Sequence, residues 1–151
     1  PFARRGPWPG EREANGPMNP STMSWVRRRA GDRCEYCRMP QRFDDLPFQI
    51  DHVIAASHGG ATAVENLCLS CFQCNSFKGP NLAGVDPVSK QIVPLFNPRR
   101  QKWTRHFAWN VAVLVGKTRS GRATIGVLRI NLPHRLAHRQ ALIAERVFPN
   151  E

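Results

Sequence analysis

The chain has 151 residues, 41% of them hydrophobic, which suits about one domain with a modest core. The longest apolar run in its basic half, residues 111–115, is far shorter than the roughly 20 residues of a membrane-spanning helix. Residues 6–20 are rich in proline and glycine and contain no apolar stretch, so we expect no secretory signal there. Lys and Arg number 22 against 11 Asp and Glu, and this net charge of +11 is typical of proteins that bind a polyanion, most often nucleic acid.

The positive charge is unevenly distributed. Residues 27–98 contain eight basic and seven acidic residues, whereas residues 99–146 contain eleven basic residues and one acid, Glu145. We therefore divide the chain into a flexible leader (1–20), a nearly neutral core (21–98) and a basic C-terminal extension (99–151). The leader need not be part of the native start, because Met18 and Met23 follow closely.

The first predicted element is a short helix over residues 21–30. Ser21 or Thr22 can cap its start, and Gly31 can end it in a left-handed conformation. Three consecutive arginines, residues 27–29, fan around such a helix instead of forming one face, so we expect a solvated surface there.

Alternating β-branched residues predict a strand over 48–54, which Gly59-Gly60 breaks. A second strand over 64–69 returns antiparallel, and residues 71–78 form a turn into a short helix. The further predictions are an extended segment at 92–96, a strand at 107–115, a helix or strand at 121–130 with helix favoured, a final helix from Asn131, and core positions for Trp103, Phe107 and Trp109.

Four cysteines have the spacing of a metal site. Cys34-x-x-Cys37 and Cys71-x-x-Cys74 supply four thiolates, enough for a closed tetrahedral structural zinc site. A redox C-x-x-C would explain one pair but not two, and an odd total of five cysteines argues against a disulfide framework. The fifth, Cys68, lies in an apolar strand, where we expect it to pack as a small hydrophobe.

Polar residues between and beside these pairs form a second constellation. Asp51-His52 ends the first strand, Asn66 opens the second, and Asn75 directly follows the last cysteine pair. Because a tetrathiolate zinc has no open position, catalysis would need a second, hard metal, for which the oxygens of Asp51 and Asn75 suit Mg²⁺ or Mn²⁺. Neighbouring strand residues point to opposite sides, so we expect one of Asp51 and His52 to hold the metal and the other to face a water molecule. Lys78 suits either a helix end or a contact with phosphate.

The order of these motifs resembles a known family. Cys-x-x-Cys, Asp-His, Gly-Gly, Glu-Asn-Leu, Cys-x-x-Cys-Asn and Lys-Gly follow one another between residues 33 and 79, as in HNH endonucleases with a ββα-metal finger. Residues 85–107 resemble, more loosely, the continuation found in many bacterial members. We therefore expect an α+β fold, with a small zinc-stabilised ββα-metal core and a basic C-terminal appendage.

The resemblance also implies a role for each polar residue. His52 is the general base that activates water, and Asp51 is a ligand of the catalytic metal. The Asn66 side chain bonds the backbone of the hairpin loop and so orients His52. Asn75 replaces the final His of the motif and completes the metal site as a weaker ligand.

The predicted function is a divalent-metal-dependent DNA endonuclease with structural Zn²⁺ and catalytic Mg²⁺ or Mn²⁺. It would act on double-stranded DNA inside the cell, in the cytoplasm of a bacterium or in phage biology, as a monomer or homodimer. The alternatives are an RNA-directed HNH nuclease or toxin, and a non-catalytic zinc-stabilised DNA-binding module. We expect four basic residues just after the finger to lie along the DNA backbone, with a merely solvated surface as the alternative; they are Arg99, Arg100, Lys102 and Arg105.

Overall fold

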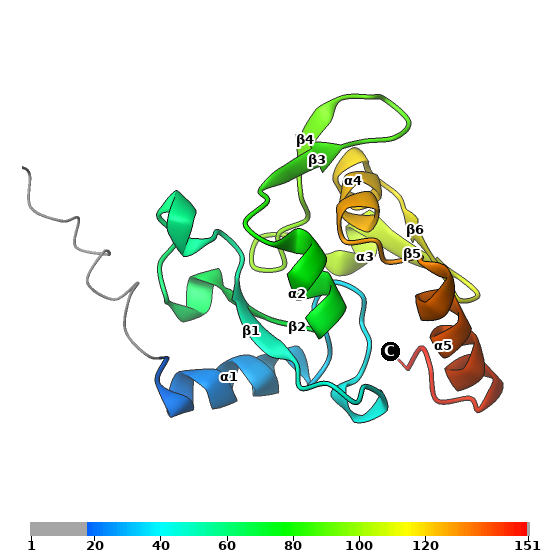
Figure 1. Ribbon diagram of the computed structural model, residues 1–151, viewed down its shortest axis with the longest axis horizontal. Helices are drawn as coiled ribbons and strands as arrows, with labels where there is room; N and C mark the ends of the chain where they lie inside the picture. The colour runs from blue at the N-terminus through cyan, green and yellow to red at the C-terminus, as the bar shows by residue number, and fades with distance from the viewer. Residues whose placement is uncertain (1–17, 151) are drawn as a thin grey trace, which may run out of the picture.

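The computed structural model describes residues 18–150, and most of the predicted leader lies outside this range. The described residues form five α-helices and three two-stranded antiparallel sheets (Figure 1). This confirms the α+β fold class. The elements in chain order are α1 (Pro20–Ala30), β1 (Gln49–His52), β2 (Leu67–Ser70), α2 (Phe72–Lys78), β3 (Ala83–Val85), β4 (Ile92–Pro94), α3 (Trp103–His106), β5 (Phe107–Asn110), β6 (Val113–Gly116), α4 (Arg119–Val127) and α5 (Pro133–Ala144).

The predicted strand–strand–helix unit is present. β1 and β2 pair antiparallel, with Asp51 opposite Cys68 and His52 opposite Leu67, and α2 follows β2 after one residue. The second strand is shorter than predicted, because residues 64–66 form a turn of 3₁₀ helix instead. All four residues of β2 are buried, so this strand is the interior one of the pair.

The helix predicted near the start of the chain is confirmed as α1, but its cap is not the predicted one. Asn19 caps it, with its Oδ1 accepting a hydrogen bond from the Ser21 amide at 2.8 Å, so the prediction of Ser21 or Thr22 was wrong. Pro20 then occupies the first helical position, where its missing N–H costs nothing. Gly31 ends the helix in the left-handed region, at φ 63°, as predicted.

The arginines of α1 are not simply a solvated surface. Arg27 Nη2 donates to the Phe48 carbonyl at 2.9 Å. Arg29 donates to the Val64 carbonyl at 2.7 Å and also to the Leu67 carbonyl. These two side chains therefore tie α1 to both sides of the β1–β2 pair, beside which α1 runs in Figure 1.

The C-terminal half differs from prediction at one turn and at the short helix α3, which was not predicted. The strand predicted over 107–115 is a hairpin, β5–β6, that reverses at Val111 with φ 55°. No glycine or proline marks this turn, so the apolar run looked continuous in the sequence. Helix α4 confirms the favoured reading of residues 121–130, and it contacts both the β5–β6 hairpin and the β3–β4 hairpin that projects at the top of Figure 1.

One apolar core serves both charge-defined parts of the chain. Trp103 and Phe107 are buried in the same cluster as Phe48 and Leu69. The Trp103 indole nitrogen also donates to the Tyr36 carbonyl at 2.8 Å. Packing therefore crosses the boundary that we drew by charge at residue 98. None of the helices between residues 18 and 150 has the length and apolar character needed to span a bilayer.

Candidate functional site

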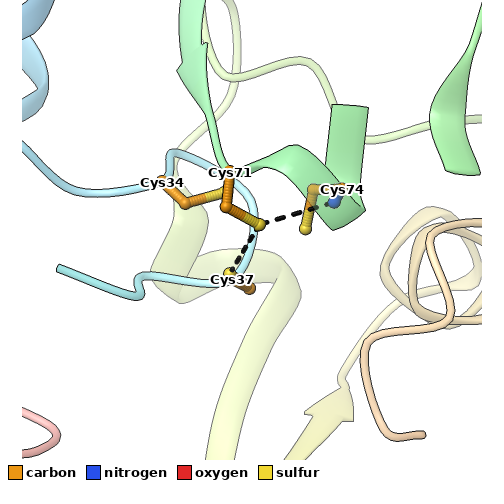
Figure 2. A group of neighbouring side chains, drawn as sticks. All are labelled: Cys34, Cys37, Cys71 and Cys74. Carbon is orange, nitrogen blue, oxygen red and sulfur yellow. Dashed lines mark hydrogen bonds between the residues drawn. The ribbon is translucent and has the colours of Figure 1, made fainter. Parts of the chain in front are cut away.

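The four paired cysteines meet in space, as predicted. Cys34 and Cys37 come from the turn after α1, whereas Cys71 and Cys74 flank the start of α2 (Figure 2). Their sulfur atoms all lie within 4.8 Å of one another, and the side chains are buried. Thiolates about 2.3 Å from a tetrahedral zinc stand about 3.8 Å apart, and the sulfurs of Cys37 and Cys71 are 3.8 Å apart. The donor set and its spacing therefore fit structural zinc.

The backbone is shaped to present these sulfurs. The Cys34 amide donates to the Met39 carbonyl at 2.9 Å, which closes the first turn, and the Cys74 amide donates to Cys71 Sγ at 3.4 Å. Cys68 stands apart, fully buried, with its sulfur 3.7 Å from the Tyr36 hydroxyl. Burial raises the pKa of the Cys68 thiol, so it stays protonated. The prediction that Cys68 belongs to the core is confirmed.

A buried carboxylate inside the first C-x-x-C changes the interpretation of Arg99. Glu35 Oε2 accepts a hydrogen bond from the Leu69 amide at 2.8 Å, and its Oε1 pairs with Arg99. Burial lowers the pKa of Arg99 to about 10. Arg99, which we expected along the DNA backbone, is therefore engaged in the fold, while Arg100 and Arg105 are exposed.

Asp51 lies beside a buried cation. Its Oδ2 is 3.0 Å from Lys78 Nζ, and the same ammonium donates to the His52 carbonyl at 3.1 Å. Burial raises the pKa of Asp51, and the Lys78 ammonium opposes that shift. Lys78 is only 2% exposed, so its ammonium faces β1 instead of solvent, unlike the predicted contact with phosphate.

His52 ends β1 at the mouth of the hairpin loop. Its Nε2 is 2.8 Å from Thr62 Oγ1, so the opposite side of the loop holds one ring nitrogen. Asn66 ties the same loop closed through three hydrogen bonds of 2.9 Å: from the Ile54 amide, to the Ile54 carbonyl and to the Ala61 carbonyl. Sequence reasoning did not single out Thr62, because one threonine in a loop has no distinctive pattern.

The structure shows why the Gly59-Gly60 motif needs a glycine at position 60. A Cβ at this position would lie 1.7 Å from the Ile54 carbonyl oxygen, so no larger residue fits without moving the backbone. The glycine thus permits the close approach that brings the two ends of the loop within reach of Asn66.

Asn75 lies on α2, three residues before Lys78 and so on the same side of the helix. Helix α2 packs against β1, which carries Asp51. Among residues 18–150, the four cysteines form the only cluster of three or more His, Cys, Asp or Glu side chains suited to a metal. A catalytic ion at β1 would thus rely on Asp51, an amide oxygen and the oxygens of water and substrate, a donor set that Mg²⁺ commonly uses.

A groove of about 300 Å³ adjoins this constellation. Its lining includes Lys78 and also Val53 and Ile54, which come just after His52. Residues 94–97 and Arg100 also line it. The groove is therefore continuous with the end of β1 and has an exposed arginine in its wall.

Comparison with known proteins finds a family similar to the β1–β2–α2 segment. The family model described as HNH endonuclease matches residues 34–81, from the first cysteine to just beyond α2. No curated protein and no solved structure matches the chain. The match confirms the resemblance to HNH endonucleases over these residues, about a third of the chain, and the C-terminal helices lie outside it.

Proposed function

We propose that this protein is a divalent-metal-dependent DNA endonuclease in which His52 is the general base. One observation carries the proposal. The segment that matches the HNH family also holds His52 at the end of β1, beside Asp51, with Asn66 closing the loop behind it. HNH domains are generally nucleases, so hydrolysis of phosphodiester bonds is the chemistry to test first.

The hydrogen bond to Thr62 suggests which nitrogen of His52 reacts. We infer that Nε2–H donates to Thr62 Oγ1, since this tautomer leaves Nδ1 with a lone pair. Nδ1 would then take the proton of the attacking water. Asn66 acts through the loop, because its hydrogen bonds keep the residues around His52 in one arrangement.

Asp51 and Asn75 would hold the Mg²⁺ or Mn²⁺ ion. That ion would supply charge neutralisation at the phosphoryl and departing oxygens. The Asp51 carboxylate already faces the Lys78 ammonium, which supports its suitability for a cation. Binding a divalent ion there requires Asp51 to exchange Lys78 for the metal, so we expect Lys78 to move when the ion binds.

The substrate that we propose is duplex DNA, nicked inside the cell by a monomer or a homodimer. The net charge of +11 supports a nucleic-acid partner. Arg100 lines the groove, and Lys102 and Arg105 come soon after it in the sequence; all three side chains are exposed. Such residues would contact phosphates and position the strand without reading its sequence. We infer 5′-phosphate and 3′-hydroxyl ends.

Plasmid nicking tests the proposal. The purified chain should nick supercoiled DNA with Mg²⁺ or Mn²⁺ and not with EDTA. His52→Ala should lower the rate by about 10²–10⁴-fold, the usual contribution of a general base. His58→Ala is the matched control, because His58 is an exposed loop histidine and should have no effect.

Three results would redirect the proposal. Near-normal nicking by His52→Ala would remove His52 as the base. Cleavage of matched RNA but not DNA would favour the RNA-directed alternative, and DNA binding without any cleavage would favour the non-catalytic module.

A further inference from the structure

An arginine from the C-terminal helix reaches the cysteine cluster. Arg135 lies on α5 and is 5% exposed. Its Nη2 donates to Cys74 Sγ at 3.1 Å and lies 3.9 Å from Cys71 Sγ. Its Nη1 donates to the carbonyls of Leu128 and Arg129, at 3.0 and 3.3 Å. The guanidinium therefore spans the gap between the end of α4 and the cysteines.

The charge of Arg135 has no carboxylate partner. Lys78, Arg99 and Arg122 each pair with a carboxylate, whereas no carboxylate among residues 18–150 forms such a pair with Arg135. A buried charge without compensation is strongly unfavourable. The groups in contact are the sulfurs of Cys71 and Cys74, which would be thiolates as zinc ligands, and four thiolates around one Zn²⁺ carry an excess of negative charge.

We propose that Arg135 is an outer-sphere partner of the zinc site, which orients and neutralises the thiolates of Cys71 and Cys74. Through it, helix α5 becomes part of the zinc site although it lies outside the segment that matches the HNH family. The proposal does not depend on nuclease activity. It also gives one of the eleven bases in the C-terminal extension a partner other than DNA.

The chain contains a matched control one helical turn away. Arg139 lies on the same helix and is 1% exposed. It donates to the carbonyls of Ala112 and Ile130, at 2.7 and 3.1 Å, and to Asn131 Oδ1, and it has no hydrogen bond to sulfur. A substitution at Arg139 therefore reports the cost of removing a buried arginine from α5 without touching the thiolates.

The experiment compares zinc retention in the full-length chain. Arg135→Gln should lower the apparent zinc affinity by about 10–100-fold, the usual effect of removing an outer-sphere partner, as measured by competition with a chromophoric chelator. Arg139→Gln should lower the melting temperature but leave the zinc affinity within about threefold of wild type. Equal loss of zinc in the two variants would overturn the proposal, because a general loss of stability would then suffice.

A spectroscopic measurement separates orientation from folding. In the Co²⁺-substituted protein, Arg135→Gln should move the sulfur-to-cobalt charge-transfer band to longer wavelength, since a thiolate without its N–H donor holds its electrons less tightly. Arg135→Lys retains the charge and serves if the Gln variant does not fold; its single ammonium cannot span both groups of partners, so a smaller shift is expected. A band unchanged from wild type in the folded variant would overturn the proposal.

Discussion

Replacing Asn66 by alanine should loosen the loop that follows β1 and slow cleavage. The change removes three hydrogen bonds, two exposed ones with Ile54 and a half-buried one with Ala61. At about 0.5–1.5 kcal/mol each, they stabilise the closed loop by about 1.5–4.5 kcal/mol. Since about 1.4 kcal/mol corresponds to a tenfold change, the open loop should become about 10- to 10³-fold more populated.

Amide hydrogen exchange at Ile54 measures this opening directly, because that amide donates to Asn66 Oδ1. In Asn66→Ala its exchange should accelerate by the same 10- to 10³-fold, and plasmid nicking should slow while zinc stays bound. Asn66→Asp keeps an acceptor for the Ile54 amide but loses both donated bonds, so exchange at Ile54 should be intermediate. The exposed Asn110→Ala is the control. Wild-type exchange and nicking in Asn66→Ala would refute the assigned role of Asn66.

Three further predictions concern zinc, pH and salt. Cys71→Ser should release zinc and unfold the domain, because structural zinc contributes about 10–16 kcal/mol against a typical net stability of about 5–15 kcal/mol; Cys68→Ala should keep its zinc by metal analysis, and loss of zinc there would contradict the ligand set. Burial lowers the pKa of His106 from 6.5, so protons bind the unfolded chain preferentially and the unfolding free energy should fall as pH drops below 6.5. In denaturation experiments, the unfolding free energy of His106→Gln should fall less steeply with pH. If its pH dependence equals that of wild type, a group other than His106 causes the fall. Replacing Arg100 and Arg105 together by Gln should flatten the slope of log K for DNA binding against log salt concentration by about 1.8. An unchanged slope would mean that these two arginines do not contact DNA phosphates.

Features that depend on local spacing were predictable. The zinc cluster follows from two C-x-x-C pairs, since each pair bends a short stretch of backbone around one ion. The strand, loop, strand and helix of the finger follow from alternation and from breaking residues, and the motif order pointed to the family whose model matches residues 34–81. The turn at Val111 was not predicted, because no glycine or proline occurs where the backbone reverses.

The partners of long charged side chains were decided only by tertiary structure. Sequence charge suggested that Lys78 and Arg99 face DNA, yet packing turns Lys78 onto Asp51 and Arg99 onto Glu35. Arg135 reaches cysteines 61 and 64 residues away in the chain. Composition specifies how many charges a chain carries and local pattern specifies its elements. Which anion a flexible cation meets depends on how those elements pack, because burial makes an unpaired charge so unfavourable that each buried cation takes whichever anion or carbonyl the fold brings within reach.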